Sequence, residues 1–363
     1  MPVHGATSRI CATCASTPLT SAVEIRAGEH DRLYVAGKAQ PGDSVWIAGN
    51  YRLTSLQHPP LEAGFPAEVR VHNGTLRITL KMPLEQYVAA VVAAEGAQGE
   101  SSQSLQAVSV AVRTFAVRFR GRHKAEGFDF CDATHCQVVH PGPVSERVRA
   151  AVQATRGELL WYEGRPAATY YHQNCGGSTA DVAEVWQGPR VPYLQEHADP
   201  YCSRTTRNAW RSVISRVDLS KALELAGMHI SEGWTALQVE SRSLAGRVWK
   251  LRFEDATGAG SAVVVSASDL RMAVDRALGW NQIRSDVYDL QASGDQIVFR
   301  GRGSGHGVGL CQKGAAEMGK EGKSYREILS FYYPGTVLSP TAQGMLHQPR
   351  PQAQLTSAHT GTY

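Results

Sequence analysis

The sequence predicts an α+β fold, in which helices and antiparallel strands form a groove and a β-rich region precedes them. Residues 22–81 alternate apolar and polar side chains in short runs between glycine and proline turns, as strands do. Residues 82–116 instead repeat apolar side chains at helical spacing. The 363 residues, of which 42% are hydrophobic and 19% charged, have the composition of an ordinary globular protein.

Charge and hydropathy exclude several classes of protein. The net charge of +4 suits an acidic polymer but is too small to indicate a nucleic-acid partner. No run of about 18 apolar residues occurs, so no membrane span is expected. The N-terminus has no basic start followed by an apolar stretch, so no signal peptide is visible.

The predicted elements follow one another with short connections. In the N-terminal region the clearest strands are residues 23–26, 33–35, 44–48 and 76–80. Helices are expected at 144–155, 217–226 and 268–278, the last with a serine cap at Ser268. Strands are expected at 158–162 and 167–171, which form a hairpin, and at 236–241, 247–253 and 262–266.

Residues 82–116 form a predicted helical pair with a glutamate between the helices. Pro83 suits the first turn of the first helix, Glu95 stands where that helix stops, and Gly96 is a plausible C-cap. Burial and the negative end of the helix dipole would both raise the pKa of Glu95. A carboxylic acid that stays protonated near neutral pH can act as a general acid. The alternative is a capping or solvent-facing glutamate.

This stretch resembles the core of the stage II sporulation protein D family, which includes the amidase enhancers of bacterial cell walls. The first helix carries the family's Pro83, Leu84, Glu85 and Tyr87. The second helix carries Leu105, Ala107, Ala111, Arg113, Thr114, Phe115 and Ala116. The intervening loop departs from the family, with Gly96-Ala97 and Gly99-Glu100-Ser101 in place of the usual Met-Pro and Trp-Pro pairs.

A cysteine- and histidine-rich segment follows at residues 127–142. Cys131, His135 and Cys136 offer the thiolate and imidazole ligands that zinc prefers. The segment resembles the family's Thr-His-Cys-Gln block, which binds zinc in some members and in which His135 and Gln137 would face substrate. The alternatives are a Cys131–Cys136 disulfide or free thiols. Three histidines could supply a fourth zinc ligand: His123, His140 and His172.

Seven cysteines are present, so at least one stays unpaired if the others form disulfides. Cys11 and Cys14 could form half of a zinc knuckle or be an incidental pair. Cys175 and Cys202 could form a disulfide in an oxidising compartment or bind a metal together with His172.

Two later blocks also resemble the family. Gly176 and Gly177, with Thr179, Glu184 and Trp186, match a segment in which paired glycines would let backbone N–H groups approach a sugar ring. A glycine-rich block at residues 299–338 contains Ser304, His306 and Gln312, and Cys311 replaces the family's usual serine. It lacks the GxxxxGK[ST] pattern of a nucleotide-binding loop. The alternative for His306 is a buried histidine that satisfies loop carbonyls.

The resemblance covers about residues 75–338 and implies the following organisation. Residues 1–21 would be a flexible segment, 22–74 the β-rich region, 75–338 the catalytic domain with an α+β insert at about 210–300, and 339–363 a disordered tail.

The resemblance implies a peptidoglycan lytic transglycosylase of the cell envelope, with Glu95 as its general acid and base. Its partner would be glycan strands, and no cofactor is required unless zinc is bound. The expected substrate-binding residues are Arg113, His135, Gln137, Gly176, Gly177, Ser304, His306 and Gln312. The alternatives are a non-catalytic wall-binding protein that stimulates an amidase, and a zinc hydrolase centred on Cys131, His135 and Cys136.

Overall fold

The chain forms two compact units that share the sequence unequally. The first comprises Met1–Gly99 and Phe119–Arg156, and the second comprises Glu100–Arg118 and Gly157–Tyr363. The predicted domain boundaries stay predictions. Gly96, Cys11 and residues 341–363 of the predicted tail lie outside the described residues, whereas Ser339 and Pro340, the first two residues of that tail, belong to a strand. The computed structural model describes residues 7–9, 14–19, 21–55, 60–95, 101–204, 209–230, 233–255 and 262–340.

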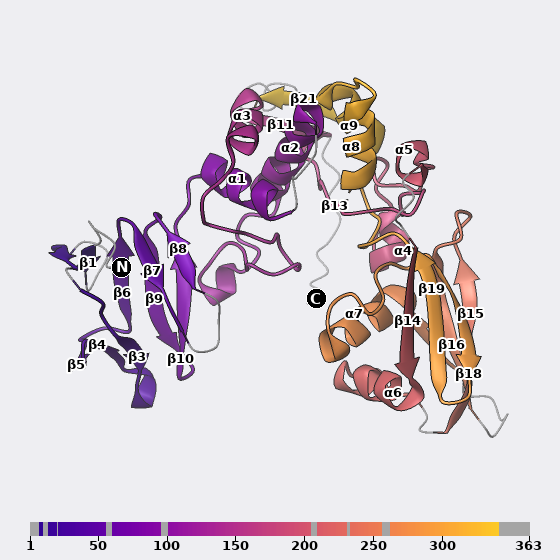
Figure 1. Cartoon of the computed structure of the whole chain (residues 1–363), viewed down its shortest axis with the longest axis horizontal. Coiled ribbons are helices and arrows are strands. Elements are labelled where there is room, and N and C mark those ends of the chain that lie inside the picture. Colours follow the sequence, from indigo (N-terminus) through magenta and orange to yellow (C-terminus); the bar gives the residue numbers. More distant parts are fainter. Residues whose placement is uncertain are drawn as a thin grey trace, which may run out of the picture. The chain divides into compact units, whose positions relative to one another are not determined.

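Short antiparallel strands build the N-terminal part of the first unit (Figure 1). They surround a core that includes Leu33, Val45, Ile47 and Val69, so the apolar positions of the alternating pattern do face inward. The predicted strands are confirmed. The main sheet has the order β10-β9-β6-β1-β2. The strands are β1 (Thr7–Arg9), β2 (Thr17–Pro18), β3 (Ile25–Ala27), β4 (Leu33–Val35), β5 (Lys38–Ala39), β6 (Ser44–Ala48), β7 (Tyr51–Leu53), β8 (Leu61–Ala63), β9 (Ala67–His72) and β10 (Thr75–Leu80).

The helices of the first unit are α1 (Leu84–Ala94) and α3 (Glu146–Ala154), which pack on each other. The α1 helix starts after Pro83 and ends at Glu95, as predicted. Its first residue, Leu84, is 40% exposed although it is apolar. The helix buries its middle turns instead, where five consecutive residues from Val88 to Val92 are covered.

The second unit is built around α2 (Ser102–Arg118), the second predicted helix. It packs against strand β11 (Glu158–Tyr162) and helices α8 (Gln312–Lys320) and α9 (Tyr325–Tyr332). The predicted hairpin is partly wrong. Strand β11 pairs with the short β12 (Arg165–Pro166) and with β21 (Val337–Pro340). Strand β13 (Tyr171–His172) instead pairs in parallel with β20 (Leu310–Cys311).

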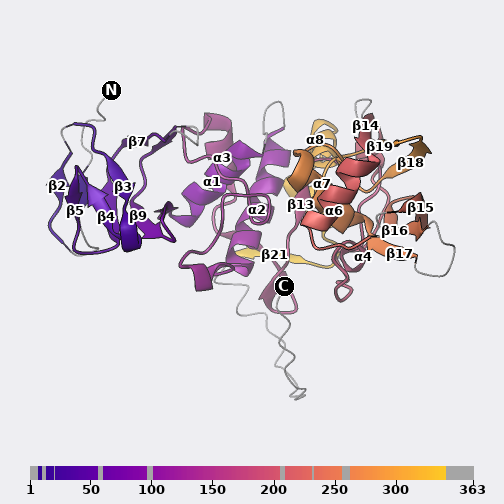
Figure 2. The same cartoon turned by 90° about the horizontal axis from the view of Figure 1, so that it is seen from below.

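The predicted α+β insert forms a lobe of the second unit with its own apolar core. Two antiparallel sheets, β14-β19-β18 and β15-β16-β17, carry helices α6 and α7, which lie side by side (Figures 1 and 2). The cap of α7 is Ser266 rather than Ser268. The helix starts at Ala267, one residue before the predicted start, and the Ser266 hydroxyl accepts the Asp269 N–H at 3.3 Å. The elements are β14 (Ala209–Ser215), α6 (Arg216–Leu225), β15 (Trp234–Arg242), β16 (Val248–Asp255), β17 (Val263–Ser266), α7 (Ala267–Leu278), β18 (Tyr288–Ser293) and β19 (Gln296–Arg302).

The second unit also has two short helices, α4 (Val182–Trp186) and α5 (Pro200–Ser203), between β13 and β14 in the chain. Across the described ranges of both units, none of the helices combines the length and apolar character that a membrane span requires.

Helix α6 offers a matched test of the lobe's core. Leu219→Ala should lower the free energy of unfolding by about 2–5 kcal/mol, because Leu219 is completely buried. Leu225→Ala on the same helix should change it by less than about 0.5 kcal/mol, because Leu225 is 72% exposed. Urea denaturation followed by tryptophan fluorescence measures both, and equal effects would contradict the packing described here.

Candidate functional site

Glu95 lies directly after α1 and caps its carboxyl end. Its backbone N–H donates to the Val91 carbonyl oxygen at 3.0 Å, so the last helical turn is closed. The side chain is half-buried. Of the predicted site residues, His135 and Gln137 share the first unit with Glu95. The remaining predicted substrate-binding residues belong to the second unit.

Gln137 is 2% exposed and is held against the first half of α1. The Tyr87 hydroxyl donates to Gln137 Oε1 at 3.0 Å, and the Tyr87 ring stacks on Phe130 at a centroid distance of 5.7 Å. Burial raises the pKa of Tyr87, so its hydroxyl remains a donor at neutral pH. The Thr-His-Cys-Gln segment is therefore anchored to the helix that carries Glu95.

Cys131, His135 and Cys136 come together with a fourth residue, His123. One ligand atom from each lies within 4.8 Å of the others. His135 Nδ1 is 3.2 Å from His123 Nε2, 3.8 Å from Cys131 Sγ and 3.7 Å from Cys136 Sγ. The cysteines are thiols rather than the disulfide considered above. Of the three candidate histidines, the structure brings His123 to this cluster.

The other ring nitrogen of His123 is held by a carboxylate. His123 Nδ1 lies 2.5 Å from Glu126 Oε1, and this contact lowers the pKa of Glu126. Histidines that bind zinc usually carry such a partner, which orients the ring and directs Nε2 toward the metal. Two thiols and two imidazoles at this spacing fit zinc. Without a metal, burial raises the pKa of Cys136 to about 11. By contrast, Cys14 is disulfide-bonded, which excludes the half zinc knuckle.

In the second unit, Gly176 and Gly177 form a turn that only glycine adopts readily, with φ of 74° and 109°. Their N–H groups do not point to open space. The Gly176 N–H donates to Asn174 Oδ1 at 2.9 Å and the Gly177 N–H to Cys175 Sγ at 3.4 Å. The expected donation to a sugar is therefore replaced by bonds within the loop. The turn still lines a cavity of about 750 Å³, together with His197.

His306 belongs to a group of rings beside this turn. It lies 5.1 Å from Trp186 and 5.5 Å from His172, measured between ring centroids, and Tyr170 lies 4.7 Å from Trp186. His306 Nδ1 accepts the Val308 N–H at 3.0 Å. Burial, followed by the positive charge of nearby arginines, lowers the pKa of His306 to about 3, so the ring is neutral. Trp186 is 43% exposed and offers an aromatic face.

The other predicted residues of the second unit serve its packing. Arg113 is completely buried and donates to the Glu158 carbonyl oxygen at 3.3 Å. The backbone of Ser304 exchanges two hydrogen bonds with Asn174. Gln312 begins α8 and is 6% exposed. Substrate binding by these three residues stays a prediction.

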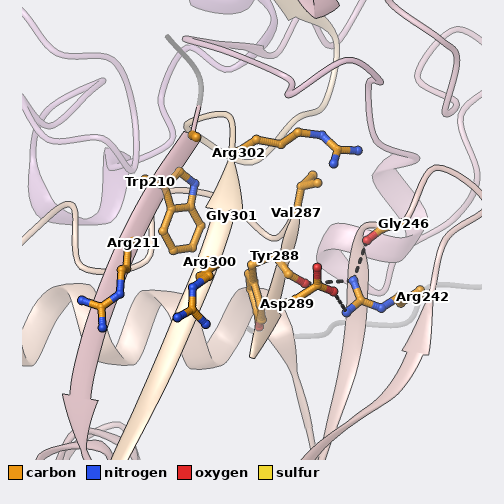
Figure 3. A pocket seen from close by; sticks show the side chains of 11 residues that line it. Trp210, Arg211, Arg242, Gly246, Val287, Tyr288, Asp289, Arg300, Gly301 and Arg302 are labelled. Atoms are coloured by element: carbon orange, nitrogen blue, oxygen red, sulfur yellow. Dashed lines mark hydrogen bonds and ion pairs between the residues drawn. The ribbon is translucent and has the colours of Figure 1, made fainter. Parts of the chain in front are cut away.

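A second cavity, of about 800 Å³, lies in the lobe, to which sequence analysis assigned no functional residue (Figure 3). Its lining includes Arg211, Arg300 and Arg302 from strands β14 and β19. Arg242 is engaged by Asp289 at 2.8 Å, as Figure 3 shows. The cavity therefore has a basic lining, and it shares Arg302 with the cavity beside Gly176.

Glu184 matches the family pattern but had no role predicted from the sequence. Its side chain is half-buried on α4. Burial, reinforced by the charges of Asp181 and Glu196, raises the pKa of Glu184 to about 7. Its spacing from the Gly176-Gly177 pair was the only signal in the sequence. The environment of a carboxyl group depends on residues that the spacing does not reveal.

The family described as Stage II sporulation protein matches residues 72–162, the segment with Glu95 and the His123 cluster. An uncharacterized protein of Brachyspira hyodysenteriae is 30% identical over 73% of this chain and 68% of its own length. The chain belongs to the stage II sporulation protein D family. Residues 202–309 of this family member also match a domain of unknown function.

Named members of the stage II sporulation protein D family are more distant. The stage II sporulation protein D of Bacillus subtilis is 25% identical over 76% of this chain and 79% of its own length. The amidase enhancer of the same organism is 26% identical over 66% of this chain but only 38% of its own length.

The raised pKa of Glu184 predicts a pH-dependent effect of Glu184→Gln. A carboxyl group that is harder to ionise in the folded than in the unfolded state destabilises the fold once it is charged. The variant should therefore match wild type below about pH 4.5 and gain thermal stability as the pH rises through about 7. The gain should be small, roughly 2 °C, because water screens a half-buried group. Thermal scans across pH measure it, and a gain at low pH only would contradict the assignment.

Proposed function

We propose that this family member is a lytic transglycosylase that cleaves peptidoglycan glycan strands, with Glu95 as its general acid and base. The observation that carries the proposal is the position of Glu95. It is half-buried at the carboxyl end of α1, inside the segment that the family matches. The negative end of the helix dipole favours the protonated carboxyl group, which a general acid requires.

The proposed reaction needs one carboxyl group. Protonated Glu95 donates its proton to the glycosidic oxygen as the β-1,4 bond after N-acetylmuramic acid breaks. The resulting carboxylate takes the proton of the sugar's C6 hydroxyl, whose oxygen bonds to C1 and closes a 1,6-anhydro ring. Ordinary glycosidases use a second carboxylate, as nucleophile or to activate water, whereas here the C6 hydroxyl takes that place and water is not consumed.

The second unit supports glycan binding. Exposed aromatic faces such as that of Trp186 pack well against the apolar faces of sugar rings. His306 beside it is a neutral ring, so this aromatic group places no positive charge next to an uncharged sugar. The cavity beside Gly176 and Gly177 has the volume of a small-ligand site.

Zinc in the first unit has a structural role under this proposal. His123, Cys131, His135 and Cys136 supply four protein ligands, which leaves no open position for water or substrate. The ion holds the segment that Gln137 ties to Tyr87, and thereby steadies the helix that ends at Glu95. A zinc ion with four protein ligands has no position for the water that a zinc hydrolase needs, so this alternative has little support.

A non-catalytic role is the second candidate. The similarity to an amidase enhancer favours a protein that binds the wall and stimulates an amidase. Under this alternative the aromatic group at Trp186 and His306 still binds glycan, whereas Glu95 has no chemical role.

Glu95→Gln separates the two candidates. The variant should lower the rate of glycan cleavage by roughly 10²–10⁴-fold, because glutamine cannot transfer the proton. Binding to insoluble peptidoglycan should be unchanged. Glu146→Gln on α3 is the matched control and should keep full activity, because Glu146 is an exposed surface residue in the same unit. Chromatography of the released fragments and a sedimentation assay measure the two effects.

Two results would favour the alternative. One is a wild-type protein that binds peptidoglycan without cleaving it. The other is equal stimulation of an added amidase by wild type and by Glu95→Gln. An inactive Glu146→Gln variant would show instead that loss of a surface charge is enough to disable the protein.

Glu126→Gln tests the zinc proposal without removing a ligand. The variant should weaken zinc binding at the His123 cluster by about 10–100-fold, since the carboxylate orients the ring of His123. Competition with a chromophoric chelator measures the affinity, and Glu146→Gln again serves as the control. Unchanged affinity would mean that the Glu126 contact is only a surface ion pair.

A further inference from the structure

The second unit contains another group of metal-ligand side chains, separate from the His123 cluster and not used by the proposed reaction. Cys175, Asp199, Cys202 and Cys311 each place a ligand atom within 4.8 Å of the other three. All four residues are at most 1% exposed. The sequence left open a Cys175–Cys202 disulfide or a metal shared with His172. The structure shows thiols and replaces His172 with Asp199 and Cys311.

The four donors come from segments that are far apart in the chain. Cys175 follows β13 and precedes the Gly176-Gly177 turn, whereas Asp199 caps α5, the helix that contains Cys202. Cys311 ends β20 and caps α8. Burying three thiols and a carboxylate together, away from water, costs folding free energy unless hydrogen bonds or a metal ion compensate for their lost hydration.

The spacing suits one tetrahedral ion. With zinc–sulfur bonds of about 2.3 Å, the ligand atoms of a tetrahedral site lie roughly 3.7 Å apart. Within the cluster, Cys175 Sγ and Asp199 Oδ2 are 3.2 Å apart, and Cys202 Sγ lies 3.1 Å from Asn174 Oδ1 beside it. These short contacts are those of protonated thiols with oxygen acceptors. An iron–sulfur cluster would need room for its own atoms between the ligands.

Backbone N–H groups already point at the sulfur atoms. The Cys175 N–H and the Gly314 N–H donate to Cys311 Sγ at 3.3 and 3.4 Å, and the Gly177 N–H donates to Cys175 Sγ at 3.4 Å. Such bonds favour the thiolate over the thiol, as does the positive N-terminal end of α8 at Cys311. The Gly176-Gly177 turn is thereby tied to the cluster through the Gly177 N–H, while the Gly176 N–H donates to Asn174 Oδ1.

The carboxylate is oriented by its own partners. The Tyr332 hydroxyl donates to Asp199 Oδ2 at 2.8 Å, and the Cys202 N–H donates to Asp199 Oδ1 at 2.9 Å. A side chain at Gly314 would collide with the Tyr332 hydroxyl and with Asp199, so glycine is required there. Ligands fixed by such second contacts are typical of metal sites in proteins.

We propose that Cys175, Cys202, Cys311 and Asp199 bind one zinc ion with a structural role. Four protein donors and complete burial leave no position for a substrate. The ion joins the Gly176-Gly177 turn, α5 and the start of α8, and so fixes the loop between β19 and β20 that carries His306. Binding replaces the thiol protons, so zinc uptake releases protons.

The test compares the two clusters in the full-length chain, kept under reducing conditions. Cys131→Ser with Cys136→Ser removes the thiols of the first cluster and provides the background. On this background, elemental analysis should find one zinc per chain. Substitution with Co²⁺ should give the intense visible bands of a tetrahedral site and charge-transfer bands from thiolates. Cys311→Ser should weaken zinc binding by at least about 100-fold and reduce the charge-transfer intensity by roughly one third.

Asp199→Cys provides a gain-of-ligand control, because a fourth thiolate should keep the zinc and increase the charge-transfer intensity. If the background variant does not fold, the same measurements are made on the wild-type chain and on Cys311→Ser alone. In the wild-type chain, Cys175, Cys202 and Cys311 should react with an alkylating agent only after a chelator removes the zinc. Cys311→Ser should lower the zinc content by one ion. Chains without metal whose three thiols react independently of the chelator would overturn the proposal. A disulfide among the three, or iron in place of zinc, would also overturn it. The outcome does not depend on whether glycan is cleaved.

Discussion

Helix α2 is buried along nearly its whole length, and its polar side chains must therefore bond to neighbouring backbone. Arg113 donates to the Glu158 carbonyl oxygen, and Thr114 Oγ1 accepts the Leu160 N–H at 3.0 Å. Thr169 returns a bond to the Ala111 carbonyl oxygen at 2.7 Å. These contacts fix β11 and the residues just before β13 relative to α2. The positions of the loops that follow β13 therefore depend on this buried helix.

In each unit, a cluster of cysteine-rich metal ligands lies near a residue of the proposed glycan site. In the first, the His123 cluster lies beside the segment bonded to α1, the helix that ends at Glu95. In the second, the Cys175 cluster lies under the loop that carries His306. In both places irregular loops, which bury little apolar surface, would be held by directional bonds to side chains rather than by a core. Rigid support of this kind is what a precisely placed acid or sugar-binding ring requires.

Local patterns predicted much of the fold and of the site. Alternation placed the N-terminal strands, and helical spacing placed α1, α2 and the stop at Glu95. The errors in the predicted fold arose where tertiary contacts determine which strands pair. In place of the second hairpin strand, β13 pairs with β20, which lies more than a hundred residues later in the chain. Periodicity is a property of neighbouring residues and carries no information about such pairing.

The metal-ligand sets show the same limit. Cys131, His135 and Cys136 are close in sequence and were found, whereas the fourth member, His123, was one of three candidates that spacing could not distinguish. In the second cluster, Asp199 and Cys311 were not connected with Cys175 at all. Aspartate is a common residue at helix caps, and only the fold reveals that this one faces three thiols.

Mass spectrometry of the cut ends of glycan strands tests the central claim most directly. Peptide-free and intact strands would be incubated with the wild-type protein, and the new termini would be identified. A lytic transglycosylase leaves 1,6-anhydro-N-acetylmuramic acid ends, because the C6 hydroxyl attacks in place of water, and these ends are the expected result. Reducing ends would contradict it and make the protein a hydrolase, and intact strands would leave it a wall-binding protein.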